Sequence, residues 1–275
     1  MMANKVRLDS LLVERGLIET REKAKRTIMA GLVFSDSQRL DKPGMKVTSD
    51  IPLEVKGKLI PYVGRGGLKL EKALTEFQID MNNKVMVDIG SSTGGFTDCA
   101  LQNGASRCYA VDVGYNQLDW KLRNDPRVVV MERTNFRYAT KDMFLFETPN
   151  FASIDVSFIS LKLILPVLKT ILDPNSEVVA LIKPQFEAGK EQVGKKGIVR
   201  DARVHHQVVT NIISFAAKEN FKLKNLTFSP ITGGDGNIEF LAHFSWNNEQ
   251  HEAFNAHDLE EQINQVIKNA HLAHN

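Results

Sequence analysis

Short apolar runs recur along the chain from residue 84 onward, with polar or mixed segments between them. The gaps between the first five runs leave room for helices or longer loops. Strands that alternate with helices favour a largely parallel sheet covered on both faces, with ligands bound outside the carboxyl ends of the strands. The sequence therefore predicts an α/β fold, and the strand candidates are residues 84–90, 107–114, 127–133, 151–158, 177–184 and 238–246.

The end of the chain has a helical pattern. Leu259, Ile263 and Ile267 recur at intervals of four within residues 257–273, so they lie on one face of an amphipathic helix. We expect this segment to form a C-terminal helix after the last strand.

The pattern of apolar and polar residues at the start of the chain differs from that of the rest. Leu8, Leu11 and Leu12 have helical spacing, and Gly16 suits the end of that helix. Residues 31–55 then form short β-like runs broken by Ser-Asp-Ser and Lys-Pro-Gly turns. We expect short helices followed by a small strand–turn–strand element.

A second helix is expected after Thr20, whose side chain suits an N-cap, and it should end near Gly31. Ala24, Ile28 and Met29 would form its apolar side. Side chains four residues apart share a helix face, which gathers positive charge on this helix. The basic residues concerned are Arg21, Lys23, Lys25 and Arg26.

Length and composition fit two domains. A chain of 275 residues is long for one compact core. We expect a small domain over residues 1–60, a linker over residues 61–64 and an α/β domain over residues 65–275. No apolar stretch approaches the roughly 20 residues that span a bilayer, and no signal-peptide core precedes the first helix. A cytoplasmic protein without a membrane partner is therefore expected.

The charge distribution is more informative than the net charge of +2. Residues 1–60 contain 12 Lys and Arg against 8 Asp and Glu, whereas residues 247–275 contain one Lys against five acidic residues. A basic front end favours an anionic partner, although solvated helix faces are also often basic. Cys99 and Cys108 do not have the spacing of a metal-binding or disulfide motif, so we expect reduced thiols. The spacing of the His residues does not indicate a metal site either, so we expect no metal.

A glycine-rich turn follows the first apolar strand. Gly90, Gly94 and Gly95 bracket small residues before a helix, which lets backbone approach a ligand closely. The spacing differs from the dinucleotide G-x-G-x-x-G pattern, so NAD is not favoured. Asp88 and Asp112 end successive strands, where acids bind ribose hydroxyls. A nucleoside-containing ligand explains the whole set, although any single glycine also suits a generic tight turn.

A lysine and an acid close the next two strands. Asp155 ends the fourth strand and Lys183 ends the fifth, where Pro184 keeps Lys183 extended. A partly desolvated lysine beside a carboxylate can serve as a base or stabilise negative charge. A structural ion pair is the simpler alternative. Strand alternation turns Glu239 away from its apolar neighbours, and Lys69 enters a helix just before the α/β domain.

The first sixty residues resemble the αL RNA-binding domain of a small-subunit ribosomal protein, pseudouridine synthases and some tRNA synthetases. The similarity lies in "RLDSLLVERGL", "TREKAKRTIMAGLV" and the turn around Asp36. In that family the second helix presents basic residues to structured RNA. The resemblance implies RNA contacts, and those we assign are Arg7, Arg21, Lys23, Lys25, Arg26 and Arg65.

Nearly the whole chain resembles the TlyA-type RNA methyltransferases, also known as hemolysin A. The most specific stretches are "GRGGLKL", "STGGFTD", "DVGYNQLDWKLRNDPRVVVMERTN", "DVSFISL", "KPQFEAGKEQVGKKGIV" and "GNIEF". The resemblance implies a Rossmann-like class I fold that uses S-adenosylmethionine. It also implies methylation of cytidine 2′-hydroxyls in ribosomal RNA, with ribosomal subunits as partners.

This family belongs to the wider FtsJ-like 2′-O-methyltransferases, whose catalytic tetrad reads Lys-Asp-Lys-Glu. By resemblance, the tetrad corresponds to Lys69, Asp155, Lys183 and Glu239. The implied cofactor residues are Asp88, Gly90, Ser91, Ser92, Thr93, Gly94, Gly95, Phe96, Asp112, Val113 and Asn135. Asn135 stands where many methyltransferases carry an acid.

Two other functions belong to different classes. A membrane-active hemolysin would need a spanning segment or a strongly amphipathic basic helix, and the sequence shows neither. A ribosome-binding factor without catalysis would not need the full set of tetrad residues, all of which are present. The modified nucleotide and the oligomeric state are left open.

Overall fold

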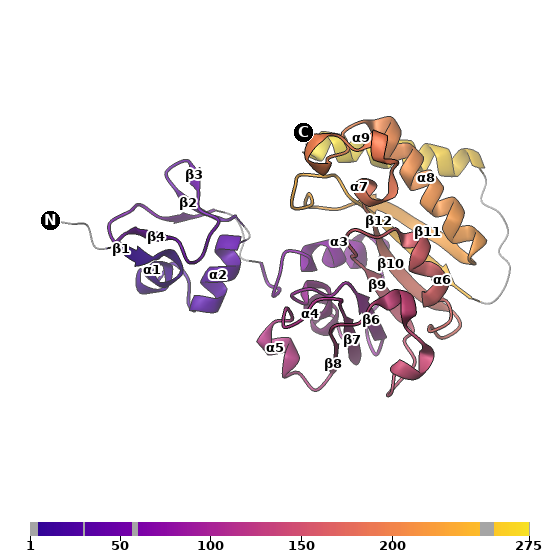
Figure 1. The fold of residues 1–275 in the computed structure, drawn as a ribbon, viewed down its shortest axis with the longest axis horizontal. Coiled ribbons are helices and arrows are strands. Elements are labelled where there is room, and N and C mark those ends of the chain that lie inside the picture. Colours follow the sequence, from indigo (N-terminus) through magenta and orange to yellow (C-terminus); the bar gives the residue numbers. More distant parts are fainter. Residues whose placement is uncertain (1–4, 30, 57–59, 248–255, 275) are drawn as a thin grey trace. The chain divides into compact units, whose positions relative to one another are not determined.

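The structure is a computed structural model that describes residues 5–29, 31–56, 60–247 and 256–274. The chain divides into two compact units, Met1–Arg65 and Gly66–Asn275, which are described separately (Figure 1). Among the described residues, no helix combines the length and apolar character needed to cross a membrane.

The first unit packs two helices against short strands. The apolar residues of α1 and α2 form its core, with Leu8, Leu12, Ala24 and Ile28 fully buried. Met29 is 58% exposed, so its predicted place on the apolar side is wrong. The elements are β1 (Lys5–Arg7), α1 (Leu8–Glu14), α2 (Arg21–Met29), β2 (Val33–Ser35), β3 (Gln38–Arg39), β4 (Lys46–Thr48) and β5 (Glu54–Val55).

Local chemistry fixes the ends of both helices. Gly16 follows α1 with a φ of +67°, a left-handed conformation that glycine adopts without strain. The Thr20 hydroxyl accepts a hydrogen bond from the Lys23 amide at 3.2 Å, as expected for an N-cap. Both predicted helix boundaries are confirmed.

The second unit is built on a seven-stranded sheet with the order β11-β12-β10-β9-β6-β7-β8. The pairs from β10 to β8 are parallel, whereas β12 runs antiparallel to both β10 and β11. The predicted α/β fold is confirmed. The strands are β6 (Val85–Ile89), β7 (Arg107–Val111), β8 (Val128–Met131), β9 (Phe151–Ile154), β10 (Ser176–Ile182), β11 (Phe221–Phe228) and β12 (Phe240–Trp246).

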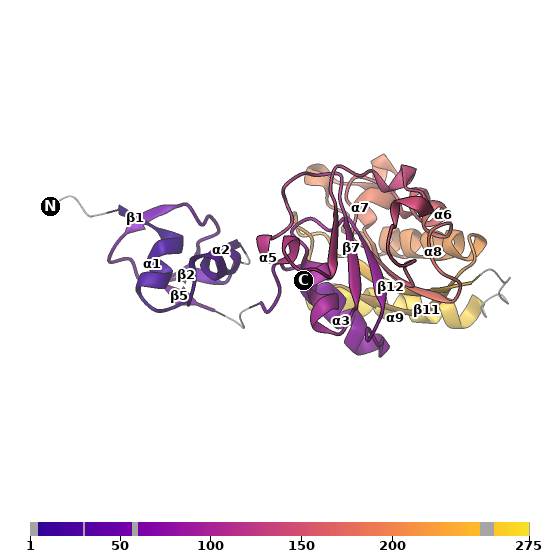
Figure 2. The ribbon, with the colours of Figure 1, turned by 90° about the horizontal axis from the view of Figure 1, so that it is seen from below.

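Helices cover both faces of this sheet. Figures 1 and 2 together place α3 and α4 on one face and α6 and α8 on the other. The face under α8 and α9 carries a large apolar core that includes Ile263 and Ile267 of the predicted C-terminal helix. The helices are α3 (Gly67–Phe77), α4 (Gly95–Gln102), α5 (Trp120–Arg123), α6 (Leu165–Leu168), α7 (Pro184–Glu187), α8 (Ala202–Lys218) and α9 (Ala256–His274).

One edge of the sheet gathers the residues that follow the parallel strands. The carboxyl ends of parallel strands meet at a common edge, which is where open α/β sheets bind ligands. Gly90, Asp112, Asp155 and Lys183 each come directly after one of these strands. Lys183 has φ −110° and ψ 102°, the extended backbone predicted from Pro184.

Candidate active site

Four charged side chains from distant parts of the chain meet at this edge. Lys69 Nζ lies 3.2 Å from Asp155 Oδ2 and 2.8 Å from Glu239 Oε2. Lys183 Nζ lies 2.5 Å from Asp155 Oδ1 and donates to Ser157 Oγ at 3.3 Å. Asp155 therefore lies between two ammonium groups, and Lys69 joins it to Glu239.

Different elements hold the members of this cluster. Lys69 is in the first turn of α3, and Glu239 directly precedes β12. Ile238 and Phe240 are buried in the apolar core, so alternation turns the Glu239 carboxylate to the opposite side. A Cβ at Gly233 would lie 2.7 Å from Glu239 Oε1, so a side chain there would displace the carboxylate from this position.

The cluster is partly shielded from water, and its ionisation follows from its charges. Burial opposes charge on Asp155, but Lys69 and Lys183 outweigh it and hold the pKa of Asp155 below its usual value. Burial likewise disfavours the Lys69 ammonium, yet Asp155 and Glu239 raise the pKa of Lys69. The arrangement keeps an ionised carboxylate on Asp155 beside the Lys183 side chain.

A cavity of about 410 Å³ begins at Asp155 and extends along the ends of β6 and β7. Its volume is typical of small-molecule sites. Asp112 accepts hydrogen bonds from the Ser92 and Gly114 amides at 2.8 and 2.7 Å, and each oxygen keeps a free lone pair for a ligand hydroxyl. The lining includes the predicted cofactor residues Gly90, Ser92, Asp112, Val113 and Asn135.

This geometry agrees with the comparison to known proteins. A profile of the FtsJ-like methyltransferases matches residues 62–246. The chain belongs to the FtsJ-like methyltransferase family. An S4 domain profile matches residues 6–50, which makes the first unit an S4 RNA-binding domain. Membership makes the protein an S-adenosylmethionine-dependent methyltransferase, and the cavity beside Asp112 has the size and hydroxyl acceptors to fit that cofactor.

Relatives extend over almost the whole length of this FtsJ-like methyltransferase. The Bacillus subtilis protein YqxC, provisionally named an rRNA methyltransferase, is 65% identical over 98% of this chain and 96% of its own. The 16S/23S rRNA (cytidine-2′-O)-methyltransferase TlyA of Mycobacterium tuberculosis is 39% identical over 97% and 98%. A solved structure from Streptococcus thermophilus, provisionally named a hemolysin, is 52% identical over 99% and 98%, with a TM-score of 0.78.

Asp88 occupies a different place from its predicted one in this methyltransferase. Its carboxylate is fully buried and does not line the cavity. It accepts hydrogen bonds from Thr97 Oγ1, the Thr97 amide and Ser153 Oγ at 2.7, 3.0 and 2.9 Å. Burial raises the pKa of Asp88 to about 6. Asp88 therefore joins β6 to α4 and β9, and it supports the glycine turn from its buried side.

Most other residues of the glycine turn also lie outside the cavity lining, although Gly90 and Ser92 belong to it. Packing explains why two positions of the turn are glycine. A Cβ at Gly90 would lie 2.5 Å from the Asp155 carbonyl oxygen, and one at Gly94 would lie 2.2 Å from Leu122 Cδ1. Both have a positive φ, which also favours glycine. The predicted residues outside the lining are Asp88, Ser91, Thr93, Gly94, Gly95 and Phe96.

Sequence reasoning missed several residues that line the cavity of this methyltransferase. Phe158 is 91% exposed, has a φ of +62° and contacts the Phe186 ring at 5.0 Å between centroids. Ser157 binds Lys183. The "DVSFISL" stretch already marked this segment, but no periodicity signals a lining residue in a loop. The missed residues are Ile89, Val111, Gln117, Thr134, Phe136, Val156, Ser157, Phe158, Ile159 and Ile164.

The residues assigned to RNA contacts lie in the first unit, and most form ion pairs there. Arg7 Nη2 and Arg21 Nε lie 2.7 and 3.3 Å from the buried Asp9 carboxylate, and the hydrogen bonds from Arg7 are the main cause that lowers the pKa of Asp9 to about 2. Lys23 pairs with Glu19, which precedes α2, and Lys25 pairs with Glu22, both on the surface. Arg26 is partly exposed and Arg65 is exposed.

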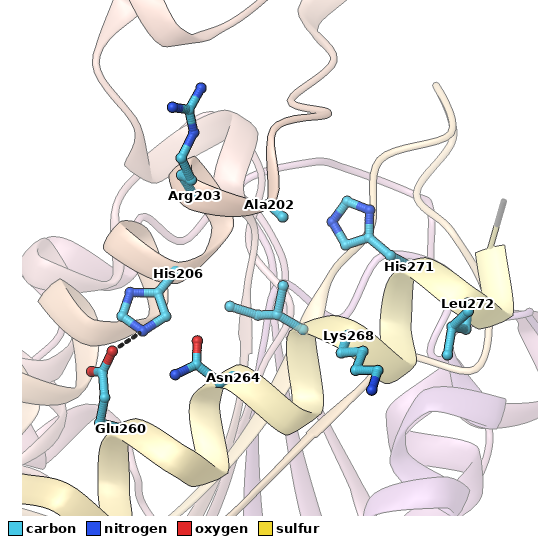
Figure 3. Close-up of a pocket in the computed structure, with 9 residues that line it drawn as sticks. Ala202, Arg203, His206, Glu260, Asn264, Lys268, His271 and Leu272 are labelled. Carbon is cyan, nitrogen blue, oxygen red and sulfur yellow. Dashed lines mark ion pairs between the residues drawn. The ribbon is translucent and has the colours of Figure 1, made fainter.

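A second cavity of about 610 Å³ lies between α8 and α9, separate from the charged cluster. Figure 3 shows Arg203 and His206 on α8 and Asn264 and His271 on α9 around it, with His206 paired to Glu260 at 2.8 Å. Its lining contains no residue of the tetrad or the cofactor cavity. Across the residues that the structure describes, no group of His, Cys, Asp and Glu side chains could hold a metal ion, and Cys99 and Cys108 are buried free thiols.

Proposed function

We propose that this protein methylates the 2′-hydroxyl of cytidine in ribosomal RNA, and that Lys69, Asp155, Lys183 and Glu239 are its catalytic residues. The observation that supports this most strongly is their convergence. Lys183 Nζ lies 2.5 Å from Asp155 and Lys69 Nζ lies 2.8 Å from Glu239, beside a cavity that fits the methyl donor.

The chemistry explains the need for such a cluster. S-adenosylmethionine supplies a methyl group that is already activated, so the protein must align the attacking oxygen and help it lose its proton. A ribose hydroxyl is a poor nucleophile until negative charge develops on its oxygen. Lys183 would contact that oxygen, either accepting its proton or stabilising the developing charge.

The other three residues hold Lys183 and the sugar in position. Asp155 binds Lys183 Nζ and fixes the direction of the amine. Lys69 neutralises both Asp155 and Glu239, so the two carboxylates remain close to each other despite their like charge. Lys69 and Glu239 would then hold the target ribose and the lysine network in position.

Binding of the donor would use the cavity lining. Asp112 offers carboxylate oxygens to the donor's ribose hydroxyls, and Gly90 lets the ligand approach the backbone. Asn135 Oδ1 already accepts the Arg137 amide at 3.2 Å, which fixes the Asn135 side chain beside the cavity. Asn135 would thereby contact the adenine with its amide group, where an acid serves in many methyltransferases.

The nature of the substrate is supported by the relatives and by the first unit. TlyA of Mycobacterium tuberculosis is named for methylation of cytidine 2′-oxygens in 16S and 23S rRNA. An S4 domain gives this chain a separate RNA-binding surface. RNA is the expected substrate because only RNA carries the 2′-hydroxyl, and the target nucleotide must leave a regular helix to be reached. Ribosomal subunits are the expected partners.

Mass spectrometric mapping of ribosomal RNA tests this function. RNA from cells that lack the gene should miss 2′-O-methylcytidine at one or more positions, and the purified protein with S-adenosylmethionine should restore it. A plasmid that encodes the Lys183→Ala variant is the matched control. Methylation on a base, or at a 2′-oxygen of another nucleoside only, would contradict the proposal.

A further inference from the structure

The segment between α7 and α8 carries positive charge without an acidic partner. Lys195, Lys196 and Arg200 are exposed, and their side chains form no ion pair or hydrogen bond in the part of the chain that the structure describes. By contrast, Arg123 elsewhere on this unit pairs with Glu132 at 2.6 Å. We call residues 194–200 the cationic turn.

Buried side chains hold the backbone of the cationic turn in place. Asn237 is 2% exposed, and its side-chain Nδ2 donates to the Gly197 carbonyl at 2.9 Å. Its Oδ1 accepts the Val199 amide at 3.0 Å. The fully buried His205 donates from Nε2 to the Val199 carbonyl at 3.1 Å. The charged side chains of the turn are therefore exposed, whereas hydrogen bonds from buried side chains hold its backbone in place.

The conformation of the turn is also costly. Lys196 has a φ of +70°, which is uncommon for a residue with a side chain, and Gly197 follows with a φ of +72°. The Gly194 amide closes the turn on the Ile198 carbonyl at 3.0 Å. Strained backbone that the surrounding structure holds in place is most common at functional sites.

The anchor connects this turn to the charged cluster of the active site. Asn237 precedes Glu239 by two residues, and its own carbonyl accepts the Gly233 amide at 2.9 Å. Glu239 Oε2 in turn binds Lys69 at 2.8 Å. One short segment thus fixes both the acid of the cluster and the position of the exposed cations.

We propose that the cationic turn binds phosphate groups of the RNA strand that carries the target nucleotide, and that Asn237 positions the turn relative to Glu239. This inference rests on the proposed function. Ammonium and guanidinium groups bind phosphates without reading sequence, and such contacts fix the register of the nucleic acid. Exposed cations without acidic partners suit a polyanion, and the anchored backbone limits the entropy lost when RNA binds.

Removal of the turn's charge tests the contact directly. The Lys195→Ala/Lys196→Ala variant should raise the KM for vacant ribosomal subunits severalfold, with kcat and the Kd for S-adenosylmethionine unchanged. In filter binding of total ribosomal RNA, the slope of log K against log salt should become shallower by roughly 1 for each lysine removed. An unchanged slope would overturn the inference.

The matched control removes two exposed lysines elsewhere on the same unit. Lys218 ends α8, roughly 25 Å from the start of that 17-residue helix, and Lys224 lies in β11. The Lys218→Ala/Lys224→Ala variant changes net charge by the same amount and should leave KM and salt slope at wild-type values. An equal loss in both variants would mean that net charge alone is responsible, which also overturns the inference.

Asn237→Leu tests the positioning role, because leucine has a similar volume but forms neither hydrogen bond. Asn237→Leu should raise KM for the subunits with a smaller effect on kcat. A variant that combines Asn237→Leu with Lys195→Ala/Lys196→Ala should have a KM no higher than the higher KM of the two separate variants. The reason is that both changes act through the same contacts. Independent, multiplicative effects would refute the positioning role.

The two proposals fail in different ways. If the wild-type protein binds ribosomal RNA but forms no 2′-O-methylcytidine, the proposed function fails, while the salt slopes still test the cationic turn. If the wild type methylates RNA and the turn variants match it in KM and in slope, the further inference alone is wrong.

Discussion

At the scale of single residues, the two lysines of the charged cluster have unequal structural roles. Lys69 contacts two carboxylates, Asp155 and Glu239, whereas Lys183 contacts one carboxylate and Ser157. Loss of Lys183 leaves Asp155 with a cation, but loss of Lys69 leaves Glu239 without one among the described residues. The lysines should therefore differ in their effect on stability even if both are needed for catalysis.

Lys183→Ala should abolish methyl transfer and leave folding and binding almost unchanged. Asp155 keeps Lys69 as a partner, so no buried charge is left unpaired. Transfer of labelled methyl groups to ribosomal subunits, calorimetric titration with S-adenosylmethionine and urea unfolding measure the three properties. A transfer rate comparable to that of the wild type would exclude Lys183 as a catalytic residue.

Lys69→Met should also abolish transfer, but with a loss of roughly 3–5 kcal/mol in the free energy of unfolding, as is typical when one partner of a buried ion pair is removed. Methionine keeps the length of the side chain and removes its charge. Urea unfolding beside Lys183→Ala provides the comparison. Equal stability of the two variants would show that Lys69 does not hold the carboxylates together.

At the scale of elements, two buried titratable groups lie where secondary-structure elements join. Asp88 joins β6 to α4, and burial raises its pKa to about 6. His205 lies on α8, where burial lowers its pKa to about 4, and His271 of α9 contacts its Nδ1 at 3.0 Å. The two shifts have opposite effects on stability between about pH 4.5 and 6.

The sign of each effect on stability follows from which state, folded or unfolded, binds the proton. In this pH window the folded protein holds a proton on Asp88 that the unfolded chain releases, so this group makes stability fall as pH rises. The unfolded chain protonates its His205, which stays neutral in the folded protein, so His205 makes stability rise with pH. In the wild type the two contributions largely cancel.

His205→Gln should reveal the contribution of Asp88. Glutamine still donates to the Val199 carbonyl but does not titrate. The free energy of unfolding of the variant minus that of the wild type should decrease by up to about 1.4 kcal/mol for each unit of pH rise between pH 4.5 and 6. Urea unfolding at several pH values measures this slope. An identical slope in both proteins would mean that His205 titrates alike in the folded and unfolded states.

At the scale of the whole molecule, the proposed function divides substrate binding between the two units. The S4 domain carries basic residues on α2, and the FtsJ-like unit carries the charged cluster and the cavity. Lys23 and Lys25 are about one-third exposed and pair only with acids on the surface, at 3.1 and 2.6 Å. Such pairs contribute little to stability and can open to bind phosphate.

Lys23→Glu/Lys25→Glu should weaken binding of ribosomal RNA strongly, because charge reversal adds repulsion to the loss of contacts. The kcat at saturating substrate and the affinity for S-adenosylmethionine should stay near wild type, because the proposed catalytic residues belong to the other unit. Filter binding and steady-state kinetics measure both. The Lys218→Glu/Lys224→Glu variant controls for net charge, and equal losses in the two variants would argue against an RNA-binding α2.

Local patterns were enough to predict most of the fold. The strand ends at Asp112 and Asp155, the extended Lys183 and the cap at Thr20 follow from short-range rules of periodicity and backbone preference. Strand β11 was missed, although Phe221 and Leu223 alternate with basic residues in the period of a strand.

The sequence by itself determined the α/β alternation, the glycine turn and the residue types of the charged cluster, because spacing records which side of an element is buried. Only the tertiary structure decided which of those residues meet. It brings Lys69 to Glu239 across 170 positions of the chain, turns Asp88 inward and joins Asn237 to the cationic turn. Such contacts depend on the order of strands in the sheet and on loop paths, which no local pattern encodes.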